Sequence, residues 1–333
     1  MTESGGLELE QFAAGATLPA AFGDPHRNAA YRQGDEPLWG GAEALLACRE
    51  GKAVGRLSLS LAPDLRGLRG PAGLIGHYEA ADPEAGALLL SRGLDRLRAL
   101  GACIAVGPMN GSTWHRYRLA LPGGGGAPFP GEPENRGRYP GDFEAAGFRI
   151  LEQYESRRVD LGPAPGAGAA QAPGLPERLR RRWRGCSRAL RLDRFEEELE
   201  AIHALTVEAF DEAVLATPIG LEEFLALYRP LKALYDPELV RLVDAPEGGL
   251  RACMVAYRDG KRLVLKTLAC RKDSRAGGLG PWLIEDAEGA ARARGCTEAI
   301  HALMHVDNHS ASISRRRSTP FRRYALYARE LRP

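Results

Sequence analysis

The sequence lacks any run of eighteen apolar residues, so no segment is long enough to cross a bilayer as an apolar helix. Its first residues, "MTESGGLELEQF", have neither the basic start nor the apolar core of a secretion signal. The six cysteines stand singly, without a CxxC pair, which argues against a zinc knuckle, a redox motif and a disulfide framework. These absences predict a cytoplasmic protein with reduced cysteines and no metal site.

The sequence also lacks a strong charge of either sign. A net charge of +2 gives no overall attraction to nucleic acid or to an anionic membrane, so an anionic partner needs a local site. We therefore expect no membrane partner, and nucleic acid is disfavoured. The basic run "PERLRRRWRG" favours a solvated helix face over a nucleic-acid patch, which would need aromatic or further basic partners. No pattern specifies an oligomeric state.

The chain of 333 residues is long enough for two domains, each with its own core. Residues 162–176, "GPAPGAGAAQAPGLP", consist almost wholly of Gly, Ala and Pro, which cannot pack and interrupt helices. We predict a first domain over residues 1–161, a linker and basic helix over 162–184, and a second domain over 185–333.

The two halves resemble each other. In the first, Leu57, Leu59 and Leu61 alternate with serines as in a strand, followed by the helical segment "GALLLSRGLDRLRALG" and the strand "CIAVGPMN". In the second, Asp259-Gly260 separates two apolar runs as in a hairpin, before a helix and the strand "EAIHALMHVDN". The repeat predicts an α/β protein built from two β-β-α-β units.

A glycine-rich loop, "RAGGLGPW", precedes the helix of the second unit. A Walker loop would need Lys after its last glycine, but Pro281 follows Gly280, and a dinucleotide fingerprint would need glycine where Leu283 stands. The spacing Arg-x-x-Gly-x-Gly, from Arg275 through Gly278 to Gly280, fits a different anion site. Glycines let backbone N–H groups converge on an anion, and the helix N-terminus adds positive charge. The loop therefore predicts a pyrophosphate site.

The strand "LVLKTLAC", this loop, the strand "AIHALMHVDN" and the ending "RRYALYAREL" resemble the GNAT superfamily of acyl-CoA N-acyltransferases over residues 187–333. The resemblance implies two tandem GNAT-like domains, each with a mixed, mostly antiparallel central sheet flanked by helices. It implies acetyl-CoA or another acyl-CoA as co-substrate, no metal, and transfer of the acyl group, with acetyl as the expected one, to a small-molecule or peptide amine. The residues implied to hold acyl-CoA are the strand backbone at Leu268, Ala269 and Cys270, the loop residues Arg275, Ala276, Gly277, Gly278, Leu279 and Gly280, and Asn308.

The first half departs from the family where the pyrophosphate should bind. Asp82 and Glu84 stand at the helix start, where carboxylates cap the helix and repel an anion. This half retains Tyr117, at the place where many family members carry the tyrosine that protonates the departing thiolate, whereas the second half has Arg315 there. We therefore expect a degenerate first copy without coenzyme A, and place the reaction in the second half.

The catalytic residues are less clearly marked. His305 is the candidate base because the pKa of histidine lies near neutrality, with an exposed or capping histidine as the alternative. Tyr324 is the candidate acid on the last strand, in preference to Tyr327, with simple packing as its alternative. In the first half, Trp114, His115 and Tyr117 either line an acceptor pocket or pack the sheet, and we favour packing.

Two other functions remain open. Arg315 in place of a tyrosine favours a non-catalytic acyl-CoA-binding or interaction protein. Tandem copies also resemble the Fem-type aminoacyl transferases, which use aminoacyl-tRNA, and the arginine run would then bind RNA. The retained glycine loop argues against this last function, because that loop serves a pyrophosphate. No motif identifies the acceptor amine.

Overall fold

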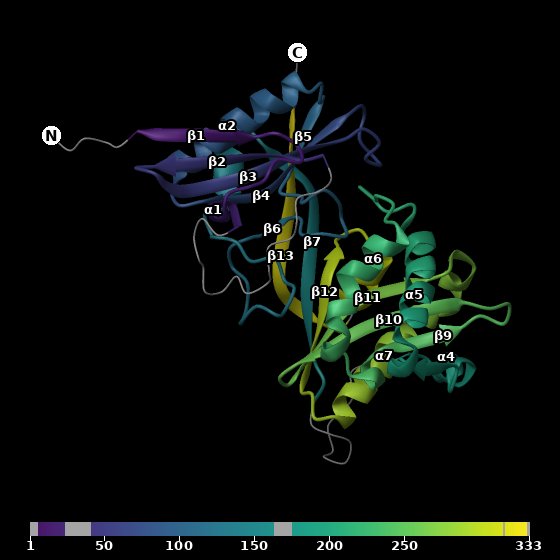
Figure 1. Cartoon of the computed structure of the whole chain (residues 1–333). Helices are drawn as coiled ribbons and strands as arrows, with labels where there is room; N and C mark the ends of the chain where they lie inside the picture. Colours follow the sequence, from purple (N-terminus) through teal and green to yellow (C-terminus); the bar gives the residue numbers. More distant parts are fainter. Residues whose placement is uncertain (1–5, 24–40, 163–174, 316, 332–333) are drawn as a thin grey trace.

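The computed structural model describes residues 6–23, 41–162, 175–315 and 317–331, and for residues 274–276 and 309 the backbone alone (Figure 1). The first half contains β1 (Leu7–Phe12), α1 (Ala20–Gly23), β2 (Glu43–Arg49), β3 (Lys52–Ala62), β4 (Ala72–Ala80), α2 (Pro83–Ala99), β5 (Ile104–Gly107), β6 (Leu119–Ala120), α3 (Tyr139–Ala145) and β7 (Arg149–Asp160). The second contains α4 (Glu177–Trp183), β8 (Ser187–Ala189), α5 (Phe195–Phe210), α6 (Leu221–Tyr228), β9 (Arg241–Asp244), β10 (Leu250–Asp259), β11 (Arg262–Cys270), η4 (Lys272–Gly277), α7 (Leu279–Ala293), β12 (Glu298–His305), α8 (His309–Arg315) and β13 (Thr319–Glu330), with short 3-10 turns between them. None of the helices in these ranges is long and apolar enough to span a membrane.

The β-β-α-β repeat predicted from the sequence is present in both halves. It consists of β3, β4, α2 and β5 in the first half and of β10, β11, α7 and β12 in the second. The predicted hairpin at Asp259-Gly260 is confirmed, because Asp259 pairs with Arg262 and Gly260 has a φ of 61°. In both units the third strand of the repeat runs parallel to the second, as a connecting helix requires.

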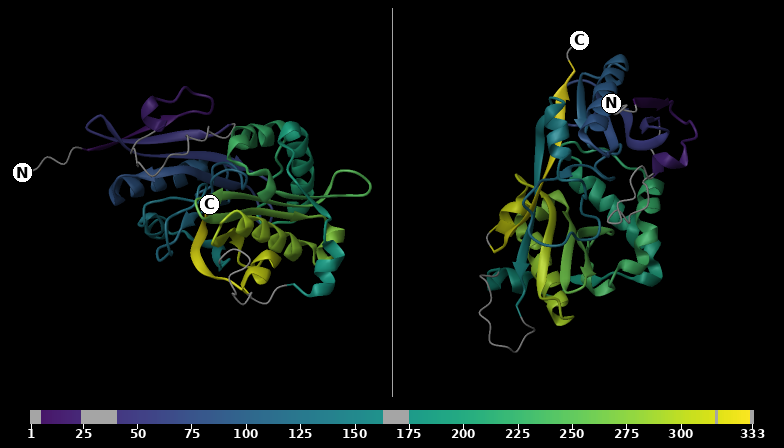
Figure 2. Two further views of the ribbon diagram at one scale, coloured as in Figure 1. Left: turned by 90° about the horizontal axis from the view of Figure 1, so that it is seen from below. Right: turned by 90° about the vertical axis from the view of Figure 1, so that its left-hand side faces the viewer.

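All the strands join one 13-stranded sheet, in the order β1-β2-β3-β4-β5-β13-β7-β12-β11-β10-β9-β8, with β6 attached to β13. The last strand of the chain, β13, therefore lies between β5 and β7 and pairs with the first half, while β7 pairs with β12 of the second half. The long strands β7 and β13 run side by side from one half to the other (Figure 1), and the halves lie at opposite ends of this pair (Figure 2).

The predicted fold class is confirmed: each half is a mixed, mostly antiparallel sheet flanked by helices. In the second half, alternate residues of β10 separate two helical layers, because neighbouring strand residues face opposite sides of a sheet. Cys253 packs with α5 and α6, whereas Ala252 and Met254 pack with α7. The predicted domain boundaries fall between β7 and β8, and the independent folding of each part stays a prediction.

Candidate active site

The parallel strands β11 and β12 separate part-way along their length. Their ladder ends at Leu265 and His301, although β11 continues to Cys270 and β12 to His305. At the same point the ladder between β10 and β11 skips Lys266, which forms a bulge. Among the described residues, β11 from Lys266 to Ala269 therefore has no ladder partner on β12, so an extended ligand can pair with this edge.

The glycine loop and the start of α7 follow the open end of β11. Gly278 has a φ of 75°, which favours glycine, and no described side chain caps α7, whose first turn has no acidic residue. Its N-terminal N–H groups and helix dipole thus favour an anion. A Cβ atom on Gly280 would lie 3.4 Å from Leu268 Cδ2 and 3.8 Å from Cys270 Sγ, so the loop borders the strand end. Two predicted loop residues, Arg275 and Ala276, have side chains outside the described part of the chain.

The basic helix α4 packs against the outer side of this loop. The Trp183 indole Nε1 donates to the Gly277 carbonyl at 2.9 Å, and a Cβ atom on Gly278 would meet Leu179 Cδ1 at 2.9 Å. On the exposed side of the helix, Arg181 pairs with Glu177 of the same helix at 3.3 Å. These contacts show a packed amphipathic helix with a solvated arginine face, as the sequence favoured.

The corresponding place between β4 and β5 of the first half is closed by the chain itself. The ladder between β4 and β5 ends at Leu74, and the Met109 N–H then donates to the Ile75 carbonyl at 2.8 Å. The side-chain Oδ1 of Asn110 accepts from the His77 N–H at 2.8 Å. The backbone groups that would pair with a ligand in a GNAT-like opening are therefore already used.

The helix that follows β4 is capped as the sequence predicted. Asp82 Oδ1 accepts from the Ala85 N–H at 2.9 Å, and Asp82 and Glu84 both pair with Arg49. The hydrogen bonds from Arg49 and the Ala85 N–H lower the pKa of Asp82, which keeps it ionised. This helix start is occupied by carboxylates, and a pyrophosphate would be repelled.

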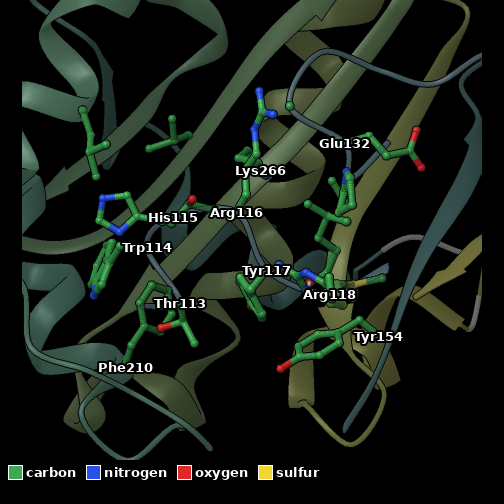
Figure 3. Close-up of a pocket in the computed structure, with 18 of the residues that line it drawn as sticks. Thr113, Trp114, His115, Arg116, Tyr117, Arg118, Glu132, Tyr154, Phe210 and Lys266 are labelled. Atoms are coloured by element: carbon green, nitrogen blue, oxygen red, sulfur yellow. Dashed lines mark hydrogen bonds between the residues drawn. The ribbon is translucent and has the colours of Figure 1, made fainter. Parts of the chain in front are cut away.

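A cavity of about 1750 Å³ adjoins the opening between β11 and β12. It lies between α5 and α6 of the second half and residues 108–119 and 128–136 of the first (Figure 3). The predicted site residues Leu268, His305 and Asn308 line it. Among the described residues, Ala269, Cys270, Gly277, Gly278, Leu279, Gly280 and Tyr324 are not part of the lining. The cavity thus lies beside the opening, with the glycine loop beyond its edge.

Lys266 lines this cavity and was not singled out from the sequence. Its side chain is exposed within the cavity, whose walls surround it at a distance that leaves room for solvent. This enclosure by the cavity walls and then the positive charge of Arg118 lower the pKa of Lys266 to about 7, against the opposing effect of Glu132. A lysine between apolar residues in "LVLKTLAC" gives no signal of such surroundings, because the groups around it belong to the other half of the chain.

His305 lies at the edge of the opening with both ring nitrogens engaged. Its Nε2 lies 2.6 Å from Glu152 Oε2, and its Nδ1 accepts from the Asp307 N–H at 3.2 Å. These partners place the proton of the neutral ring on Nε2. The ring also makes an edge contact with Tyr154, with centroids 5.2 Å apart. A role as base requires one of these bonds to open, and it stays a prediction.

Tyr324 is fully buried beneath the cavity. Its hydroxyl donates to Glu132 and lies 2.9 Å from Ser156 Oγ. Burial and the Glu132 carboxylate raise the pKa of Tyr324, so the phenol stays protonated. Glu132 is one of the residues that line the cavity, and its buried carboxylate also pairs with Arg322 at 2.8 Å. The predicted role of Tyr324 as the acid is not tested by this placement.

Arg315, in the place of the family's tyrosine, is an anchored residue. Its Nε pairs with Glu155 at 2.7 Å, and its Nη2 donates to the Val306 carbonyl at 2.8 Å. Nearby, Arg317 pairs with Glu288 at 2.5 Å. These contacts tie α8 and the chain after it to β7 and α7.

Residues 114–117 of the first half line the cavity, which corrects the interpretation that they only pack the sheet. Trp114 also packs, since its Nε1 donates to the Thr217 carbonyl at 2.8 Å and its ring meets Phe224 edge-on. Glu134, from the same half, lines the cavity as well, and burial together with the charge of Glu132 raises its pKa. A carboxyl with a raised pKa is suited to accept a proton near neutrality.

No family model and no curated protein matches the sequence. Among solved structures, the chain is similar to a GCN5-related N-acetyltransferase from Sphaerobacter thermophilus, with 17% identity, a TM-score of 0.54, and coverage of 98% of this chain and 96% of that one. It is similar to a tandem GNAT protein from the clavulanic acid biosynthesis pathway, with 13% identity, a TM-score of 0.54, and coverage of 98% and 99%. The chain therefore has the fold of the GCN5-related N-acetyltransferases, in its tandem form.

Proposed function

We propose that the protein is an N-acyltransferase that moves an acyl group, acetyl in the simplest case, from acyl-CoA to an amine at the opening of the second half. The observation that carries this proposal is the asymmetry between the halves. The strands β11 and β12 separate beside a helix start without a described cap, whereas the matching strands and helix of the first half are closed by Asn110 and Asp82. The cysteines are free thiols, which fits the reducing cytoplasm.

The residues present fit an acyl-CoA. The β11 backbone at Leu268, Ala269 and Cys270, which lies beyond the end of the ladder with β12, would hold the pantetheine arm. The loop at 277–280 with the start of α7 would hold the pyrophosphate. Asn308, at the start of α8, would contact the arm near the cavity. When bound, acyl-CoA supplies the activated thioester, and the chain supplies orientation and proton transfer.

Two proton movements are needed at the cavity. The acceptor ammonium must lose a proton before it can attack, and we propose that His305 or Glu134, which both line the cavity, takes it. The departing thiolate benefits from a proton, for which we propose the path from Tyr324 through Glu132. Both steps use groups at the junction of the two halves.

The decisive experiment measures free thiol released from acetyl-CoA on addition of a panel of primary amines. The proposal predicts release that saturates with both acetyl-CoA and at least one amine. Saturable binding of acetyl-CoA without release for any amine would favour the alternative of a non-catalytic acyl-CoA-binding protein. Absence of both binding and release would overturn the proposal.

The role of Tyr324 can be tested with Tyr324→Phe, which keeps the ring and removes the hydroxyl. If the tyrosine supplies the proton, we expect kcat to fall by about 100-fold or more and the basic limb of the pH profile to move, because Glu132 loses its donor. Tyr327→Phe is the matched control, since the Tyr327 hydroxyl contacts Glu144 outside the cavity. A Tyr324→Phe protein with unchanged kcat and pH profile would remove this tyrosine from the mechanism.

A further inference from the structure

Two cationic side chains from different halves of the chain, Lys266 and Arg118, line the same cavity without a carboxylate partner among the described residues. Among the described residues, Lys266 makes no hydrogen bond or ion pair, and Arg118 makes no ion pair. The Arg118 Nε is shielded from solvent and has no hydrogen-bond acceptor among the residues described. A shielded donor without an acceptor is unfavourable, so an anion that accepts from Arg118 and is attracted by Lys266 would be bound favourably.

The Arg118 guanidinium is held in one orientation. It stacks on the rings of Tyr117 and Tyr154, at 3.9 Å and 4.2 Å from their centroids, and its Nη1 donates to the Leu303 carbonyl at 3.2 Å (Figure 3). Both ends of that hydrogen bond lie on strained backbone, with a φ of 69° at Arg118 and 57° at Leu303. Strain at both ends of a contact between the halves is typical of a functional site.

The chemistry of the lining indicates which anion fits. A fixed, planar guanidinium matches the two oxygens of a carboxylate. The carboxylate of Glu134 lines the same cavity and would oppose the higher charge of a phosphate, but it suits an amine. The neighbouring Glu132 is already paired with Arg322 at 2.8 Å. The rest of the lining includes Phe210 and Phe224, which offer apolar surface. A ligand with a carboxylate, an amine and an apolar body complements all three features.

We propose that Arg118 and Lys266 form a carboxylate-binding subsite, and that the acceptor is an amino acid or a related amine that carries a carboxylate and an apolar side chain. The identification of the ligand as acceptor rests on the proposed acyl transfer, but binding of the carboxylate does not. The charged groups whose fields reach Lys266 are Arg118 and, with opposite effect, Glu132. Because Lys266 must be protonated to attract the carboxylate, affinity falls as the pH rises through about 7.

The binding test uses 3-phenylpropanoate, which has a carboxylate and an apolar body but no amine to acylate, and its neutral match 3-phenylpropanamide. We expect saturable calorimetric binding of the acid only, with an affinity that falls by about tenfold between about pH 6 and pH 8 as Lys266 loses its proton. Lys266→Met should weaken it by tenfold or more, while Lys261→Met, at the exposed turn before β11 and outside the lining, should not. Equal binding of acid and amide, or an unchanged affinity in Lys266→Met, would overturn the subsite.

The same variant has a second readout in stability. The pKa of Lys266 in the folded protein lies below that of an unfolded lysine, so its charge destabilises the fold at neutral and acidic pH, and this effect decreases as the pH rises above about 7. Lys266→Met should therefore unfold at a higher temperature than the native protein, with a larger gain at about pH 6 than at about pH 9. A lower unfolding temperature at both values would contradict the unpaired state of Lys266.

The acceptor role is tested separately by thiol release with L-phenylalanine and phenethylamine, which differ only in the carboxylate. We expect kcat/KM for phenylalanine to exceed that for phenethylamine by tenfold or more. Equal values would overturn the acceptor assignment while leaving the acyltransferase function in place. Binding of 3-phenylpropanoate without thiol release for any amine would leave the subsite in place and contradict the acyltransferase function.

Discussion

Replacing Gly280 by aspartate is expected to weaken acetyl-CoA binding by at least tenfold, or about 1.4 kcal/mol. The new carboxylate would lie in the first turn of α7, beside Leu268 and Cys270, where the proposed pyrophosphate binds. A negative charge there suits the helix dipole but repels a phosphate, and a thermal unfolding curve shows whether this buried position keeps the variant folded. Isothermal titration calorimetry with acetyl-CoA measures the effect.

Two control variants separate charge from shape in this prediction. Gly280→Ala adds the same Cβ atom without the charge and should bind acetyl-CoA within about threefold of the native protein. Gly289→Asp adds the charge to α7 at a position where a Cβ atom meets nothing within 4 Å, and should leave binding unchanged. Gly278 is less suitable, since its φ of 75° strains any other residue. Native affinity in Gly280→Asp would exclude the loop from the site.

Replacing Glu288 by alanine is expected to lower the free energy of unfolding by about 3–5 kcal/mol. Glu288 on α7 is 2% exposed, and its carboxylate lies 2.9 Å from His301 Nε2 and pairs with Arg317. Burial alone would raise the pKa of Glu288, but the hydrogen bonds and charges of His301 and Arg317 outweigh it and hold this pKa below its usual 4.5. The alanine variant leaves both partners without their carboxylate.

Urea unfolding near pH 7 measures this loss, with Glu288→Gln as the conservative variant that keeps the shape and should lose less. Because the pKa of Glu288 is lowered in the fold, its contribution is complete above about pH 4.5 and is lost as the pH falls below that value. The native protein should therefore lose more stability on acidification than the alanine variant does. A loss below about 1 kcal/mol near pH 7 would show that the network does not hold α7 to β12.

The parts of the fold that depend on neighbouring residues could be predicted from the sequence. The hairpin at Asp259-Gly260, the helix after Gly278 and the cap at Asp82 all follow from residues within a few positions of one another. The fold class could be predicted because both halves show strand and helix patterns in the same β-β-α-β order. Local chemistry also distinguished the glycine loop of one half from the acidic helix start of the other.

The junction between the halves could not be predicted in this way. The pairing of Tyr327 on β13 with Gly107 on β5 joins strands that are more than 200 residues apart in the sequence. The alternation of apolar and polar residues within a strand does not specify which strand lies beside it. Because β13 of the second half lies in the sheet of the first half, Tyr324 on this strand contacts Glu132 of the first half. Lys266 and Arg118 line the same cavity because the two halves join there, so the sequence of either half alone does not predict their shared site.

The most direct test of the account is a calorimetric titration of the unmodified protein with acetyl-CoA. The account predicts one saturable site per chain, because in the part of the chain that the structure describes only the second half combines separated strands with a helix start free of carboxylates. Two equivalent sites would contradict the closure of the first half by Asn110 and Asp82. The absence of saturable binding would contradict the central claim that the opening beside Gly278 and Gly280 holds an acyl-CoA.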